Sequence, residues 1–163
     1  MKHYLFNFRP RFIIILFSCA LFGTGLVTAA PLASGDHFPA LKDMQDQHEV
    51  AYTLPRCVEH IAVAYTMSVG KSANGYFAKK GATYLPEQNA VFIANVYGMP
   101  AIGRFFAMPK MKKYPHRIML ADSEGLLEDF PQKDDRVTVF DLDATGKIVA
   151  IRYWNPEKEE ITF

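Results

Sequence analysis

The stretch Val137-Thr-Val-Phe-Asp-Leu-Asp-Ala-Thr-Gly-Lys-Ile-Val149 decides the fold of this chain. Apolar and β-branched residues stand on both sides of Asp143-Ala-Thr-Gly146, and Asp and Gly are residues that tight turns prefer. The pattern predicts two strands, residues 136–142 and 147–154, joined by a short turn. Strands joined in this way pair antiparallel, so the two should form a hairpin that closes a sheet.

Three further strands are predicted upstream of this hairpin. Residues 60–66 and 90–95 are continuous apolar runs, typical of strands that are buried on both faces. A third strand, residues 117–121, ends in the turn sequence Asp122-Ser-Glu-Gly125. Residues 46–54 contain a short edge strand.

Two helices are predicted between these strands. Residues 73–80 form one, with Ser72 as its N-cap and Gly81 at its C-terminal end. Pro100 begins the other, which ends or kinks near Pro109. The Ile102, Phe105 and Phe106 side chains lie on one side of this second helix, and we expect them to face the core.

The order of these elements predicts a single α/β domain. Strands separated by a helix become parallel neighbours, so one mixed sheet with helices on both faces follows. The charged tail, residues 155–163, is expected to form a short terminal helix.

Three stretches of the sequence resemble the thioredoxin-like superfamily, and within it the exported thiol-reductase and peroxiredoxin-like branch. They are Gly35-Asp-His-Phe-Pro-Ala-Leu41 with the following residues 46–50, then Ile118-Met-Leu-Ala-Asp-Ser-Glu-Gly125, and the closing hairpin itself. The resemblance implies a thioredoxin-like mixed sheet flanked by helices, with a β-α-β-α-β-β core, over residues 30–163.

The chain differs from that superfamily at the positions that carry the superfamily's redox chemistry. The redox cysteines of the superfamily follow the first core strand, but Tyr65-Thr-Met-Ser-Val-Gly-Lys-Ser72 has none. Val137, after Arg136, stands where the superfamily places a cis-proline, and a non-proline residue predicts a trans bond. The resemblance therefore implies the fold without the usual thiol chemistry. Gly98-Met-Pro100 with Tyr114-Pro115 also resembles chains described as flavin dehydrogenases.

Residues 1–29 have the pattern of a secretory signal peptide. A basic start is followed by an apolar run from Phe12 and by Val27-Thr28-Ala29, which predicts cleavage before Ala30 and a periplasmic protein. A retained membrane anchor and a lipoprotein acylated at Cys19 are the alternatives, and only these two would place the protein on a membrane.

Charge and cysteine content argue against a general nucleic-acid-binding protein and exclude an internal disulfide outside the signal. Three of the 18 Lys and Arg residues lie in the signal, so residues 30–163 carry 15 against 17 Asp and Glu. This balance gives no general attraction for nucleic acid. Cys57 is the single cysteine outside the signal, so no internal disulfide is possible there.

Other familiar motifs are incomplete. Val69-Gly-Lys-Ser72 ends like a phosphate-binding loop, but Tyr65 stands where that loop needs a glycine. A calcium loop starting at Asp141 would need an acid where Arg152 stands. The histidines outside the signal lack zinc-ligand spacing, and no serine-hydrolase pattern occurs, so we predict no metal, no cofactor and no catalytic residue.

Two candidate sites for an anion remain. The first is the start of the first helix, whose N–H groups and neighbouring cations favour anions. Its residues are Ser68, Lys71, Ser72 and Arg136. The rival is a basic cluster on and after the second helix, made of Arg104, Lys110, Lys112, Lys113 and Arg117.

The sequence thus favours a non-redox binding or scaffold protein of the bacterial cell envelope. Its partner is expected to be another envelope protein or a small anionic ligand. The alternative is an envelope oxidoreductase that uses Cys57 as a thiol or associates with a flavin, as a dehydrogenase does.

Overall fold

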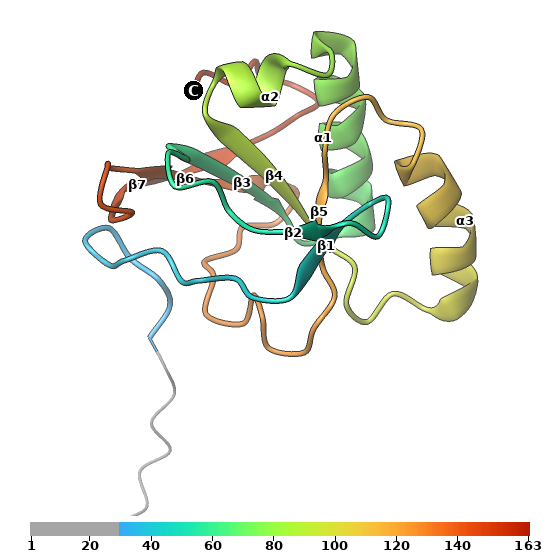
Figure 1. Cartoon of the computed structure of the whole chain (residues 1–163), viewed down its shortest axis with the longest axis horizontal. Helices are drawn as coiled ribbons and strands as arrows, with labels where there is room; N and C mark the ends of the chain where they lie inside the picture. The colour runs from blue at the N-terminus through green and yellow to red at the C-terminus, as the bar shows by residue number, and fades with distance from the viewer. Residues whose placement is uncertain (1–29) are drawn as a thin grey trace, which may run out of the picture.

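The computed structural model describes residues 30–163, and the predicted signal peptide lies outside them. Figure 1 shows one twisted sheet with the helices gathered beside it. Its strands are β1 (Met44–Asp46), β2 (Ala51–Tyr52), β3 (His60–Ala64), β4 (Ala90–Asn95), β5 (Met119–Ala121), β6 (Val137–Leu142) and β7 (Ile148–Trp154). The helices are α1 (Met67–Lys80), α2 (Tyr84–Glu87) and α3 (Ala101–Met111).

The strands form a mixed sheet in the order β2-β1-β5-β4-β3-β6-β7. β3, β4 and β5 are parallel to one another, whereas β6 is antiparallel to β3 and β7 is antiparallel to β6. These pairings confirm the parallel strands and the closing hairpin that the sequence predicts. β3 and β4 are almost wholly buried, as expected for the centre of such a sheet.

The edge strands form a hairpin of their own. β1 and β2 pair antiparallel, and β1 also pairs with β5. The sequence predicts one short edge strand here, but the turn between Asp46 and Val50 splits it into two. The Asp46 carboxylate stabilises that turn by accepting hydrogen bonds from the backbone N–H groups of His48 and Val50.

The two faces of the sheet are covered differently, which corrects the expectation of helices on both faces. The core on one face contains residues of all three helices, including Phe77, Leu85 and Met111. The core on the other face is closed by irregular segments that contribute Leu41, Leu127 and Phe130. Apolar residues in loops therefore take the place of a second layer of helices.

α1 begins earlier than the sequence predicts. Its N-cap is Thr66, not Ser72, and the Thr66 hydroxyl accepts a hydrogen bond from the Val69 N–H. Residues 67–72 contain Ser, Gly and β-branched Val, which are weak helix formers. Here Val69 and Gly70 are buried against the sheet, so packing overrides propensity. Gly81 ends the helix as predicted, with φ of 100°.

Two other segments differ from the sequence prediction. The short helix α2 is not foreseen, since its four residues include Pro86. The tail does not form a helix: residues 156–158 make a turn and residues 159–163 are irregular. Ile161 and Phe163 pack against the core in this form, which a surface helix would not allow.

α3 forms at the predicted residues, but its apolar side faces away from the core. Ile102, Phe105 and Phe106 are 68%, 71% and 59% exposed, and Met111 is the buried residue of this helix. The expectation that these three side chains face the core is therefore wrong. The cause is that α3 stands at the margin of the sheet and reaches the core only through its last turn (Figure 1).

Candidate ligand-binding groove

A groove opens at the edge of the sheet where β3 and β4 end. α1 and α3 both start at this edge and stand side by side (Figure 1). In open α/β sheets, ligands collect outside the carboxyl ends of parallel strands. The cavity between the two helices has a volume of about 340 Å³, within the roughly 300–1,000 Å³ of small-molecule sites.

Small residues create this cavity. Ala64 and Ala94 form part of its floor, and Gly70, Gly103 and Ala107 form part of its helical walls. The remaining lining residues are larger: Thr66, Met67, Lys71, Asn74, Asn95, Val96, Met99, Phe106, Lys110, Met111 and Tyr114. Because two adjoining helices present Gly and Ala to each other without closing the gap, a space remains that a ligand can fill.

The mouth of the groove continues into an exposed apolar surface on α3. Met67 and Phe106 line the groove and are both more than half exposed. Phe106 contacts Phe105 edge to face, with ring centroids 5.3 Å apart, and Ile102 lies on the same helix. We call Ile102, Phe105 and Phe106 the α3 apolar face. Contiguous exposed apolar groups of this kind mark binding sites in soluble proteins.

The predicted anion site at the start of α1 is divided by the structure. Lys71 lines the groove toward α3, whereas Arg136 lines a separate depression with Ser68 and Tyr65. The loop before β6 thus lies beside the start of α1, as the resemblance implies. Its peptide bond before Val137 is trans, as predicted, because residues 30–163 contain no cis bond.

Carboxylates of the tail already hold two of the four residues of that site. The Ser72 hydroxyl donates to Glu157 at 2.8 Å, and the Arg136 guanidinium pairs with Glu159 at 2.7 Å. Ser68 is exposed between these two contacts. Of the four predicted residues, Lys71 alone faces the groove.

Most of the rival basic cluster is also paired within the chain. Arg104 pairs with Asp122, Lys112 with Glu49 at 2.7 Å, and Arg117 with Asp46 at 2.8 Å. Arg117 also stacks on the Tyr52 ring. Burial alone would raise the pKa of Asp46, but hydrogen bonds from the Val50 and His48 N–H groups and from Arg117 lower it. Lys110 and Lys113 make no ion pair within residues 30–163, and Lys110 lines the groove.

His116 and Asn74 form a buried polar pair behind the groove. The two side chains are 1% and 3% exposed, and His116 Nε2 lies 2.9 Å from Asn74 Oδ1. His116 Nδ1 has no hydrogen-bond partner within residues 30–163. Burial lowers the pKa of this histidine to about 4, so it is neutral at pH 7. The sequence did not reveal this pair, because Asn74 and His116 are 42 positions apart and no local pattern links them.

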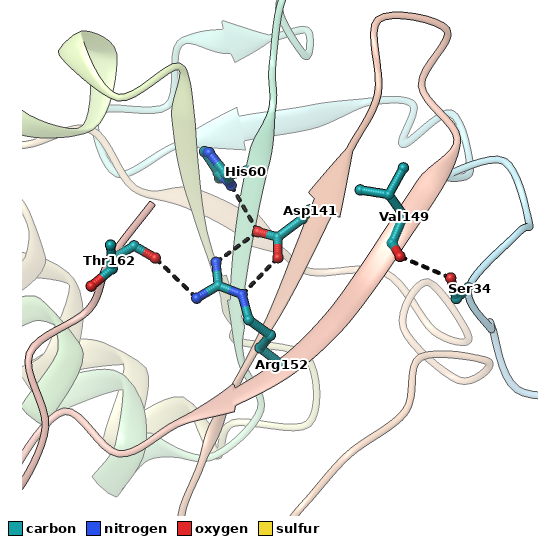
Figure 2. A network of polar contacts seen from close by, with 6 residues as sticks. All are labelled: Ser34, His60, Asp141, Val149, Arg152 and Thr162. Carbon is teal, nitrogen blue, oxygen red and sulfur yellow. Dashed lines mark hydrogen bonds and ion pairs between the residues drawn. The ribbon is translucent and has the colours of Figure 1, made fainter.

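A second polar network lies at the opposite edge of the sheet (Figure 2). Asp141 accepts two hydrogen bonds from Arg152, at 2.6 and 2.7 Å, and lies 2.8 Å from His60 Nδ1. Arg152 also donates to the Thr162 carbonyl at 2.9 Å, and Ser34 donates to the Val149 carbonyl on the same strand. The network joins β3, β6, β7 and the tail, so its role is structural.

The acids of the incomplete calcium loop are used in this network and in the hairpin turn. Asp143 accepts hydrogen bonds from the N–H groups of Thr145 and Lys147, which is how an Asp stabilises a turn. Among residues 30–163, no three or more His, Cys, Asp or Glu side chains are arranged to hold a metal ion.

Cys57 lies far from the groove along the strand direction. It is exposed in a turn that precedes His60, the first residue of β3, whereas the groove opens after Ala64 at the other end of that strand.

Solved structures with the same architecture include a bacterial thiol-disulfide oxidoreductase and bacterial peroxiredoxin-like proteins. The thioredoxin domain of a thiol-disulfide oxidoreductase from Bacteroides vulgatus matches 74% of this chain and 88% of its own, with 17% identity and a TM-score of 0.51. A peroxiredoxin-like protein from Aquifex aeolicus matches 78% and 79%, with 13% identity and a TM-score of 0.53.

This chain has a thioredoxin-like fold. A peroxidoxin from Mycobacterium tuberculosis supports the same conclusion, with 13% identity, a TM-score of 0.50, and coverage of 76% of this chain and 88% of its own. No protein-family model and no curated protein matches the sequence. At such identities the likeness concerns the fold, and function has to be argued from the site. No helix within residues 30–163 is long and apolar enough to cross a membrane.

Proposed function

We propose that this thioredoxin-like domain is an exported binding protein of the bacterial cell envelope. Its binding site is the groove between α1 and α3, and it does not carry out thiol exchange. One observation carries the proposal: at the position of the redox site of this fold, the chain has an apolar cavity and no cysteine. Where redox relatives of this fold need cysteine, Thr66 to Ser72 have none, and the same position opens into an apolar cavity.

The α3 apolar face supports binding over catalysis. Burying one large apolar side chain contributes about 1.5–3 kcal/mol, and α3 leaves Ile102, Phe105 and Phe106 mostly in water. A partner or ligand that covers part of this surface recovers that free energy. No pair of titratable groups in the groove has the arrangement of a general acid and base, since its charged residues are Lys71 and Lys110.

Native mass spectrometry of the protein purified from its own envelope tests the proposal. We expect a retained ligand or partner on the wild-type protein and its loss in Gly70→Leu, which fills the groove. A Cβ at Gly70 would lie 3.8 Å from Ala64 Cβ, an ordinary contact, so the variant should fold. Gly75→Leu is the matched control, because a Cβ at Gly75 meets no atom within 4 Å.

The alternative function is a thiol oxidoreductase that acts through Cys57, and the exposure of Cys57 favours it. The test is turnover of an insulin disulfide or a peroxide by wild type and by Cys57→Ser. We expect no thiol-dependent turnover in either protein. Because the side chain is exposed, the substitution should change the free energy of unfolding by less than about 0.5 kcal/mol. Turnover that Cys57→Ser abolishes would replace the binding function with the oxidoreductase.

A further inference from the structure

The groove is apolar at one end and cationic at the other. Met67, Met99 and Gly103 lie together at the end where the helices begin: a Cβ on Gly103 would be within 4 Å of both methionines. One to two turns further along, the lining consists of Lys71 and Asn74 on α1 and Lys110 on α3, with Tyr114 just beyond. The apolar and cationic ends would fix the orientation of a molecule bound in the groove.

The cationic end is not neutralised by the protein. Lys71 and Lys110 make no ion pair within residues 30–163, and no Asp or Glu lines the groove. α1 and α3 have no acidic residue at all. Two lysines without an acidic neighbour beside an apolar cavity indicate an anionic group in the ligand.

Asn74 adds a fixed polar group inside the groove. Its Oδ1 is held by His116 Nε2 at 2.9 Å, and its side chain is 97% buried because the residue is 3% exposed. Its amide nitrogen has no hydrogen-bond partner among residues 30–163, although it lies in the wall of the cavity. A ligand oxygen placed beside the lysines would accept a hydrogen bond from this amide nitrogen.

The apolar end suits a flexible chain rather than a rigid ring. Met67 and Met99 contribute two unbranched side chains, which adapt to irregular apolar shapes. A second copy of this protein is a poorer occupant, because pairing two such grooves would bring Lys71 and Lys110 against the same cations of the other copy.

We infer that the groove binds a single-chain amphiphile with an anionic head, such as a carboxylate or a phosphate on an alkyl chain. The head lies at Lys71, Lys110 and Asn74, and the chain extends toward Met67, Met99 and Phe106. This inference rests on the proposed function, because it assigns a ligand class to the same groove.

Binding of dodecanoate, dodecyl phosphate and the neutral dodecanol to the purified protein, below micelle concentrations, tests it. We expect both anions to bind and dodecanol to bind at least about tenfold more weakly, a difference of about 1.4 kcal/mol. Octanoate has four methylenes fewer than dodecanoate and should bind roughly 250-fold more weakly, since each buried methylene contributes about fourfold. The two anions distinguish a fatty acid from a lipid phosphate as the natural head group.

Variants of the lining residues test whether these compounds bind in the groove. Lys71→Glu with Lys110→Glu should weaken dodecanoate at least about tenfold and leave dodecanol unchanged. Lys79→Glu with Lys113→Glu makes the same change of net charge outside the groove and should have no effect. Gly70→Leu should abolish binding of all three compounds, and Gly75→Leu should not.

Four results would overturn the inference. If dodecanol binds as tightly as dodecanoate, or if charge reversal has no effect while Gly70→Leu abolishes binding, the groove is a binding site but not for anions. If the protein binds vesicles of anionic phospholipid and no monomeric amphiphile, the α3 apolar face docks on membranes instead. If Gly70→Leu removes nothing, from these compounds or from the envelope protein, the proposed function fails as well.

Discussion

Single side chains explain both the success and the limits of the sequence prediction. Gly81 and the Asp143 turn act through local backbone chemistry, so their roles can be predicted from a few neighbouring residues. His116 cannot be assigned in this way, because its environment comes from Phe77 on α1 and Phe92 on β4, which are distant in sequence. Its position between lysines and an arginine indicated a surface charge, and tertiary packing made it a neutral core residue.

His116 should make the protein sensitive to acid. Its pKa falls from 6.5 to about 4 on folding, so the unfolded chain binds more protons between these values. Stability is therefore complete above about pH 6.5 and declines as the pH falls toward 4, by roughly 3 kcal/mol for a shift of this size. Urea unfolding of wild type and His116→Gln across this range checks it. An equal pH slope in the two proteins would contradict the assignment.

The elements were easier to predict than the surfaces they present. Residue patterns located α3 closely, and they predicted the order of β3 to β7 along the chain, the parallel strands and the antiparallel closing hairpin, because periodicity and turn residues are local signals. Periodicity also shows that α3 has an apolar side, but it does not show what covers that side. We assigned Ile102, Phe105 and Phe106 to the core for this reason. The candidate groove was missed because its walls come from Gly and Ala on two separate helices.

The exposed position of Phe105 leads to a prediction about stability. Phe105→Ser removes a side chain that is 71% exposed, so the free energy of unfolding should change by less than about 0.5 kcal/mol. Phe92→Ala, in the centre of the core at 0% exposure, should lower it by about 3–5 kcal/mol. Urea denaturation of both variants measures the contrast. A loss of more than about 2 kcal/mol in Phe105→Ser would mean that α3 is covered in the free protein.

At the scale of the whole molecule, the two ends of the described segment, residues 30–163, hold the sheet together. Ser34 reaches β7 on one side, and the tail reaches back to α1, β6 and β7 on the other. Tyr76 and Lys80 both bond Glu160, and the Trp154 indole donates to the Glu159 carbonyl at 2.9 Å. A charged tail gives no local signal for such contacts, which is why the sequence indicated a surface helix instead. The tail carboxylates of Glu157 and Glu159 bind Ser72 and Arg136, which belong to the predicted anion site. The groove therefore remains as the open site.

The Asp141 network should control how firmly the tail is held (Figure 2). Burial would raise the pKa of Asp141, but hydrogen bonds from Arg152 and His60 lower it, so the carboxylate is ionised at pH 7. Its contribution to the free energy of unfolding is lost only as the pH falls through that lowered pKa. Asp141→Asn leaves Arg152 without its bidentate partner and should lower the free energy of unfolding by about 1–3 kcal/mol at pH 7. Trp154 is the single tryptophan and is buried under the tail, so its fluorescence should shift to longer wavelength as the tail loosens. Arg152→Lys, which keeps the charge but not the fork of donors, should show a smaller shift. Unchanged fluorescence and stability in Asp141→Asn would show that Ile161 and Phe163 hold the tail by apolar packing alone.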